Sequence, residues 1–230
     1  MSDLIDTTEM YLRTILELEE EGQVPLRARI SERLEQSGPT VSQTVGRMER
    51  DGLVVVTGDR HLELTEKGRE LAVQVMRKHR LVERLLSDII GLEWEFVHDE
   101  ACRWEHVVSE QVERKIIKLI STPDISPYGN PIPGLEEFGL NVNPAFNEGV
   151  ISVASLPGVG TAGRDFVLRR IGEPLQVDPE LLAQLKSLAL VPGATINVEF
   201  RSAHVFVSAK GNPEGIELEA DLAHHLFVEK

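Results

Sequence analysis

The stretch that decides the fold runs from residue 26 to residue 65 and reads LRARISERLEQSGPTVSQTVGRMERDGLVVVTGDRHLELT. Apolar spacing and chain breakers predict a helix over residues 26–34, a tight glycine turn at residues 36–39 and a second helix over residues 40–50. The runs that follow alternate apolar and polar residues around Gly58–Asp59, which predicts a β-hairpin. Helix, turn, helix and hairpin in this order indicate a winged helix-turn-helix.

Short polar side chains gather at the start of the second of these helices, and basic side chains flank them. In a helix-turn-helix, the second helix presents polar groups to base edges while basic groups hold phosphates. The predicted DNA-binding residues are Arg27, Arg29, Ser37, Pro39, Thr40, Ser42, Gln43, Arg47, Arg50 and Arg60, and we add Ala28 to this set. The alternative is an ordinary helical hairpin with a solvated polar face, but the adjoining β-hairpin favours DNA binding.

The whole chain is acidic, with 24 basic and 38 acidic residues among 230 and a formal net charge of −14. This balance argues against DNA binding, because proteins that neutralise phosphates usually carry a basic domain. Distant acidic groups repel DNA only weakly, since the Debye length is about 8 Å at physiological ionic strength. A local cationic strip made by the arginines named above answers the objection.

The rest of the first 120 residues is predominantly helical. Predicted helices cover residues 3–21, 66–92, 94–111 and 112–120. The 66–92 helix is apolar on more than one face, which favours its burial against a second subunit. We therefore expect this region to form a homodimer.

A composition change separates this helical part from the C-terminal part. Prolines and glycines crowd residues 122–147, which predicts a linker, and strand-like runs with turns follow, as in a small β-barrel. The predicted fold class is α+β. We place a DNA-binding domain at residues 1–73, a helical dimerisation and metal-binding domain at 74–140, and a C-terminal domain at 141–230.

Neither a membrane span nor a secretory signal is recognisable in the sequence. We therefore expect a cytoplasmic protein without a membrane partner. The single cysteine, Cys102, excludes an internal disulfide and leaves a thiol for metal binding, catalysis or burial.

The segment HDEACRWEH places His98, Cys102, Glu105 and His106 at helical spacing, so one helix face is predicted to carry all four. Thiolate, imidazole and carboxylate together suit a first-row transition ion such as ferrous iron, nickel or cobalt better than magnesium or calcium. A small buried cysteine beside solvated charges is the alternative. His79 and Glu83 form a second pair, four residues apart, for which an ordinary exposed helix pair is an equally good interpretation.

Five segments in the right order resemble one known family. These are DTTEMYLRT (6–14), PLRARISERLEQSGPTVSQTVGRMERDGL (25–53), VMRKHRLVERLL (75–86), HDEACRWEHV (98–107) and SPYGNPIPGL (126–135). They closely resemble the diphtheria toxin repressor family of iron-dependent regulators in actinobacteria, densely over about the first 140 residues and loosely beyond them. The resemblance implies a winged-helix domain, a helical dimerisation and metal domain, and an SH3-like C-terminal domain.

The resemblance also implies two metal sites per subunit. The activating site would comprise Met10, Cys102, Glu105 and His106. The ancillary site would comprise His79, Glu83, His98, Glu173 and Gln176. Manganese-sensing relatives typically carry carboxylates where this chain has Met10 and Cys102, so the resemblance favours iron.

The function implied is that of a repressor of iron uptake and iron homeostasis genes, with Fe²⁺ as corepressor. Mn²⁺, Co²⁺, Ni²⁺ or Zn²⁺ can be expected to substitute in vitro. The partners would be operator double-stranded DNA and a second subunit, with room for two dimers on one operator. An enzyme with Cys102 as nucleophile or with a hydrolytic metal site, and a metal-storage protein or metallochaperone, are the alternatives. Neither explains the helix-turn-helix and the wing, and we do not expect an enzyme.

Overall fold

A computed structural model of the chain describes residues 6–141, 144–157, 159–160, 162–202 and 204–230. The chain divides into two compact units. The first comprises Met1–Val82, Ala101–Asp124 and Ile132–Asn143, and the second comprises Glu83–Glu100, Ile125–Pro131 and Pro144–Lys230. None of the helices among these described residues is long and apolar enough to cross a membrane.

The first unit begins with α1 (Thr7–Glu20), which the Asp6 carboxylate caps by accepting hydrogen bonds from the amides of Thr8 and Glu9. Residues 3–5 of the predicted helix lie outside the described part of the chain. Apolar side chains of α1, Ile15 among them, are buried in one core with α2 (Arg27–Arg33) and α3 (Gly38–Arg50). The predicted pair of helices after α1 is therefore confirmed.

The turn between α2 and α3 is not the glycine turn that the sequence predicted. The amide of Gln36 donates to the carbonyl of Ser31 and that of Glu35 to Glu32, which is the hydrogen-bond pattern of a Schellman motif. Glu35 takes the left-handed conformation there, with φ 51°. Gly38 instead opens α3, because the Ser37 side chain caps that helix.

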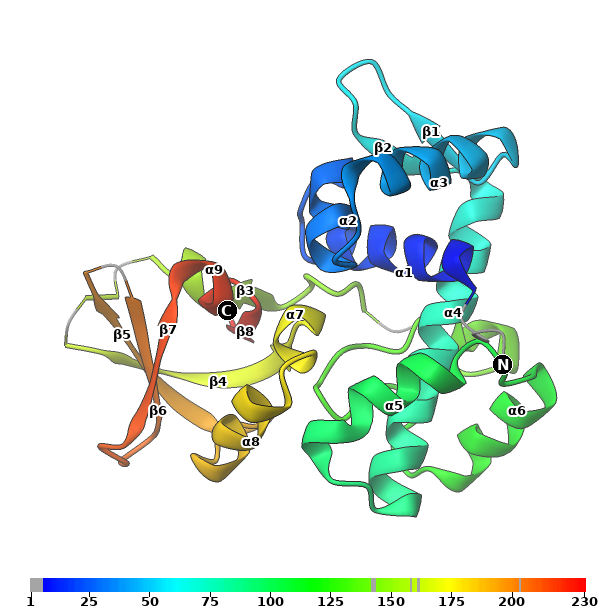
Figure 1. Cartoon of the computed structure of the whole chain (residues 1–230). Helices are drawn as coiled ribbons and strands as arrows, with labels where there is room; N and C mark the ends of the chain where they lie inside the picture. Colours follow the sequence, from blue (N-terminus) through cyan, green and yellow to red (C-terminus); the bar gives the residue numbers. More distant parts are fainter. Residues whose placement is uncertain (1–5, 142–143, 158, 161, 203) are drawn as a thin grey trace. The chain divides into compact units, whose positions relative to one another are not determined.

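The wing consists of β1 (Val54–Val56) and β2 (Leu62–Leu64), an antiparallel pair that lies beside α3 (Figure 1). The loop closes through a hydrogen bond from the amide of Arg60 to the carbonyl of Thr57. Arg60 adopts φ 71°, so the loop places an exposed arginine next to its tip. The predicted hairpin is confirmed, with a longer connection than Gly58–Asp59.

The long helix α4 (Glu66–Arg84) continues as one π-helical segment, Leu85–Ile90, and ends at Gly91, whose φ is 77°. A 3₁₀ turn at Trp94–Phe96 precedes α5 (Val97–Trp104), and α6 (Glu110–Leu119) follows after a break. The predicted 94–111 helix is therefore wrong at its C-terminal end. Glu105 and His106 lie in a turn beyond α5 and not on its face.

Part of the predicted linker is held against this helical region by Arg77 of α4. The Arg77 guanidinium, almost completely buried, lies 2.9 Å from Glu113 on α6 and donates a 3.0 Å hydrogen bond to the carbonyl of Gly134. It also lies over the ring of Phe138, which belongs to the 3₁₀ turn Leu135–Phe138. Residues 132–138 are thus an ordered segment of the first unit.

The second unit contains a six-stranded antiparallel sheet in the order β3-β8-β4-β5-β6-β7 (Figure 1). Its strands are β3 (Val150–Ser152), β4 (Arg164–Ile171), β5 (Thr195–Arg201), β6 (His204–Ala209), β7 (Gly215–Glu219) and β8 (Leu226–Glu229). The helices α7 (Glu173–Gln176), α8 (Pro179–Ser187) and α9 (Ala220–Ala223) were not predicted. The predicted strand-rich C-terminal domain is confirmed.

The acidic run at the end of α1 is paired with arginines from several helices. Glu17 and Glu21 meet Arg33 of α2, while Arg69 and Arg80 of α4 meet the remaining carboxylates of the run. The Arg80 pair is bidentate, with its two nitrogens 3.0 and 2.6 Å from the Glu20 oxygens. These pairs tie α1 to both α2 and α4.

Candidate metal centre and nucleic-acid interface

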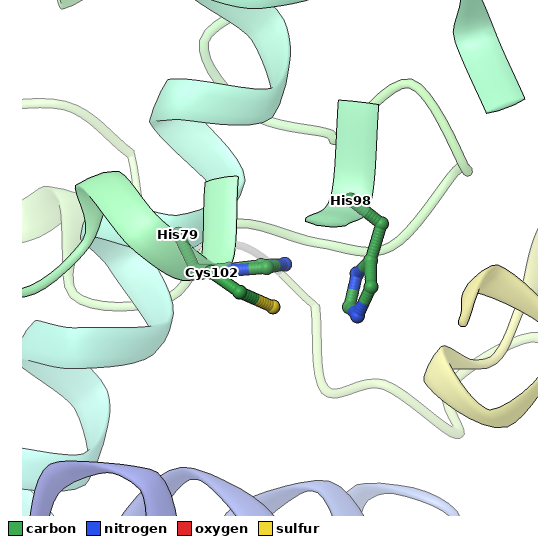
Figure 2. Close-up of side chains that lie close together, drawn as sticks. All are labelled: His79, His98 and Cys102. Carbon is green, nitrogen blue, oxygen red and sulfur yellow. The ribbon is translucent and has the colours of Figure 1, made fainter. Parts of the chain in front are cut away.

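Two imidazoles and the thiol come together where α4 and α5 meet. His79 of α4 and His98 and Cys102 of α5 each offer a ligand atom, and these three atoms lie within 4.8 Å of one another. Figure 2 shows the His79 ring and the Cys102 sulfur side by side, both pointing toward the His98 ring. Spacing on α5 explains part of this, because residues four apart share one helix face. The set can hold a soft or borderline divalent cation.

The turn after α5 adds a second group of ligand atoms. Glu105 is buried, and its Oε1 lies 3.4 Å from Nε2 of His106. Both atoms are buried without a hydrogen-bond partner among the described residues. Leaving a buried carboxylate oxygen and imidazole nitrogen without partners is costly, and a cation between them would satisfy both. The residues present therefore fit a metal ion.

Arg13 of α1 reaches into the same place, which the sequence analysis did not foresee. Its Nη1 lies 2.6 Å from Glu105 Oε2, 3.3 Å from Cys102 Sγ and 2.9 Å from His79 Nδ1. Burial alone would lower the pKa of Arg13, but the adjacent Cys102 and Glu105 raise it well above its usual value. The guanidinium is therefore charged.

The ionised state of Glu105 follows from the same contacts. Burial by itself raises the pKa of this carboxyl, but the charge of Arg13 and a 2.7 Å hydrogen bond to His79 outweigh burial and lower the pKa to about 2. Glu105 is thus a carboxylate, the form that can ligate a cation, at any physiological pH.

Met10 lies on α1 between two residues that contact this cluster. Glu9 is 2.6 Å from Nδ1 of His106, and Arg13 follows Met10 by three positions on the same side of the helix. Glu9 and Arg13 lie four positions apart, so they share one side of α1, but nothing in the sequence indicates what that side contacts. Both were missed because charged residues on a helix are usually solvated.

The residues predicted for the second set lie on α4, α5 and α7. Glu83, His98, Glu173 and Gln176 are all buried, and His98 Nδ1 lies 3.4 Å from Glu83 Oε1. Gln176 donates to the carbonyl of Ile171, while its Oε1 is buried and accepts no hydrogen bond from the described residues. One contact links the two predicted sets, because Oε2 of Glu105 in the first set lies 2.7 Å from Nδ1 of His79 in the second.

The predicted DNA-binding face is formed by one side of α3 with its flanking elements. α3 buries Val41, Val45 and Met48 in the core and leaves Ser42, Gln43, Arg47 and Arg50 exposed. Ala28, Ser37, Pro39, Thr40 and Arg60 are exposed as well, and Arg27 is half-buried. Arg29 is half-buried, and its guanidinium donates to the carbonyl of Val24.

Three family models match successive parts of the chain. They describe the N-terminal DNA-binding domain of iron dependent repressors (residues 3–62), their metal binding and dimerisation domain (65–134) and the diphtheria toxin repressor SH3 domain (163–230). The iron-dependent repressor IdeR of Mycobacterium tuberculosis H37Rv is 54% identical over 231 residues and 100% of both chains. The chain belongs to the iron-dependent repressor family. Its relatives are transcriptional repressors and not enzymes.

Other members of the family are similarly close. The diphtheria toxin repressor of Corynebacterium diphtheriae is 54% identical over 233 residues, again over 100% of both chains. Among solved structures, a manganese-dependent transcriptional repressor in complex with manganese has a TM-score of 0.80 at 25% identity, covering 97% of this chain and 100% of its own. The crystal structure of T. acidophilum IdeR has a TM-score of 0.75 at 28% identity, covering 97% and 98%. The resemblance stated from sequence is confirmed.

Proposed function

We propose that this protein is a Fe²⁺-activated repressor that binds operator DNA as a homodimer and controls iron uptake and iron homeostasis genes in the cytoplasm. The observation that carries this proposal is the buried group around Glu105 and His106. Both residues offer buried ligand atoms without hydrogen-bond partners, and both contact α1, which packs against the helix-turn-helix. The family supports DNA binding, metal dependence and dimerisation.

Met10, Cys102, Glu105 and His106 would hold the activating ion, and His79, Glu83, His98, Glu173 and Gln176 the ancillary one. A bound divalent cation supplies positive charge that carboxylate, imidazole and thiolate ligands share. The thiol and the thioether favour Fe²⁺ over harder ions such as Mn²⁺. The domain boundaries proposed are residues 1–73, 74–140 and 141–230.

In this mechanism the protein's own residues would hold α1 in one position. With ligands on α1 and on the turn after α5, the first helix would be held to the metal-binding region. Because α1 packs against α2, and α2 against α3, this restraint passes to the helix that faces DNA. In a dimer it would set the separation of the two recognition helices, so that both can enter successive major grooves.

The test is duplex DNA binding with metal as the variable. A random-sequence duplex library is selected with full-length protein and Fe²⁺ under anaerobic conditions, and the selected sequence is then titrated with and without a chelator. We expect binding only with Fe²⁺, and a twofold-symmetric selected sequence. Binding that is unchanged by the chelator would contradict the metal-dependent function.

A matched pair of variants ties the effect to the proposed ligands. Glu105→Gln removes a buried carboxylate at the cluster, whereas Glu110→Gln removes an exposed one that pairs with Arg114 on α6. We expect Glu105→Gln, and also Cys102→Ser, to remain folded and lose Fe²⁺-dependent DNA binding. Glu110→Gln should bind like the wild type. Equal behaviour of Glu105→Gln and Glu110→Gln would argue against this metal centre.

A further inference from the structure

A single nitrogen of Arg13 lies where the ligand atoms converge. Nη1 is within 3.3 Å of Cys102 Sγ, 2.9 Å of His79 Nδ1 and 2.6 Å of Glu105 Oε2. It carries two N–H groups but has three such neighbours, all of which are candidate metal ligands. Cys102 and Glu105 belong to the proposed activating set, and His79 belongs to the proposed ancillary set.

We propose that the Arg13 guanidinium is a resident cation of this cluster, which a divalent metal must displace from Cys102 and Glu105. The inference rests on the proposed function and deepens it by adding a residue that sets metal affinity. In the metal-free protein the metal site is then not open, because the Arg13 guanidinium occupies it as an internal competitor. The threshold concentration for activation depends on how strongly Arg13 is held.

Arg13 has neighbours that can hold its side chain both in the metal-free protein and after a metal ion has displaced it. Its Nε lies 2.9 Å from Glu17 Oε1, one turn further along α1, so the side chain has an anionic partner that is not a metal ligand. Glu17 in turn lies 3.6 Å from Arg33 of α2. A guanidinium that leaves Glu105 can thus keep its contact with Glu17, which lowers the cost of displacement.

The alternative is that Arg13 is only a structural partner of Glu105. A structural ion pair would stabilise the metal-free and the metal-loaded protein alike. A competitor stabilises the metal-free protein only, because the metal takes over its partners in the loaded protein. Metal affinity and stability measured on the same variants therefore separate the two roles.

The experiment is calorimetric titration of Co²⁺ into metal-free, full-length protein, together with thermal unfolding with and without Co²⁺. Arg13→Gln should bind Co²⁺ at least about tenfold more tightly than the wild type, which corresponds to about 1.4 kcal/mol. Its unfolding temperature should be lower than that of the wild type without Co²⁺ and should rise more on Co²⁺ addition. Arg33→Gln is the matched control, because it removes a half-buried arginine that pairs with Glu17 and Glu21 at the end of α1 and not with the three candidate ligands near Arg13. Its Co²⁺ affinity should stay at the wild-type value.

The outcomes distinguish the inference from the proposed function. Wild-type protein that binds no Co²⁺ contradicts the proposed function itself. Wild-type binding that Cys102→Ser abolishes, with Arg13→Gln binding no more tightly than the wild type, overturns the inference alone. If Arg13→Gln does not fold without metal, Arg13→Lys replaces it. The shorter lysine cannot span the same three contacts, so Co²⁺ binding tighter than wild type supports displacement, and equal or weaker binding overturns it.

Discussion

The Glu9 carboxylate lies 2.6 Å from Nδ1 of His106, across the contact between α1 and the turn after α5. A carboxylate at Nδ1 holds the proton on that nitrogen, which leaves the lone pair on Nε2. Nε2 is the nitrogen that lies 3.4 Å from Glu105 Oε1. Glu9 thus orients the imidazole toward the proposed metal position.

Glu9→Ala is therefore expected to weaken Co²⁺ binding by about 10–100-fold, the usual cost of losing a residue that orients a metal ligand. Calorimetric titration measures the change. Glu19→Ala is the control, since Glu19 lies on the same helix but pairs with Arg69. Equal losses for the two variants would show that the effect comes from α1 stability and not from His106.

Gln43→Ala is expected to weaken binding to the selected operator while sparing binding to unrelated duplexes, because it removes a base contact and no charge. Arg60→Ala should weaken both, because the exposed arginine beside the wing tip would hold a phosphate. Competition titrations with specific and unrelated duplexes compare the two. A parallel loss for Gln43→Ala would remove this residue from the base-reading set.

Glu35→Gly is expected to stabilise the protein by about 0.5–1 kcal/mol, because glycine adopts the left-handed conformation at the end of α2 without strain. Chemical denaturation gives the free energy of unfolding. Glu32→Gly lies three residues earlier, inside α2, and should instead destabilise by about 1 kcal/mol. Destabilisation by both variants would mean that the Glu35 side chain matters more than its backbone strain.

Gly134→Ala is expected to cost at least about 1 kcal/mol more than Gly139→Ala, because both glycines have a positive φ but only one is crowded. A Cβ at Gly134 would lie 2.6 Å from Nη1 of Arg77 and 2.7 Å from Cγ1 of Val73, whereas a Cβ at Gly139 meets nothing within 4 Å. Urea denaturation of both variants gives the difference. Similar losses would show that the Arg77 and Val73 side chains move aside for the added methyl group at little cost.

Local patterns predicted most of the fold because the decisive signals were local. The apolar spacing of α1 and α3 and the alternation around the wing each reflect one element and its immediate neighbours. The end of α5 was missed because residues 105–109 contain neither glycine nor proline, the usual sequence signals of a helix end. The helices α7 and α9, with four residues each, have too few turns to show a clear period. The nine-residue α8 was missed although Asp178 and Pro179 mark its start.

Spacing and resemblance identified the candidate ligands, but they did not show which of these ligands lie close together in the fold. Spacing placed His98, Cys102, Glu105 and His106 on one face, whereas the helix ends at Trp104 and Glu105 turns toward His79 of α4. Arg13 could not be assigned from sequence, since its role depends on α1 lying against α4 and α5. Such a contact between elements distant in sequence has no local signature.

The ion pairs of the acidic run at the end of α1 reduce the repulsion that the negative net charge of the chain would exert on DNA. The four carboxylates of this run face three arginines of α2 and α4, because Glu17 and Glu21 share Arg33. Most of their charge is thus paired, and the field of a pair fades faster with distance than that of an isolated charge. The salt dependence of operator binding should then reflect the number of arginines that contact phosphates and release counterions. Each such contact adds about 0.9 to the slope with which the logarithm of the binding constant falls against the logarithm of the salt concentration. A chain with a formal charge of −14 would thus lose affinity with added salt as steeply as a basic repressor with the same DNA contacts.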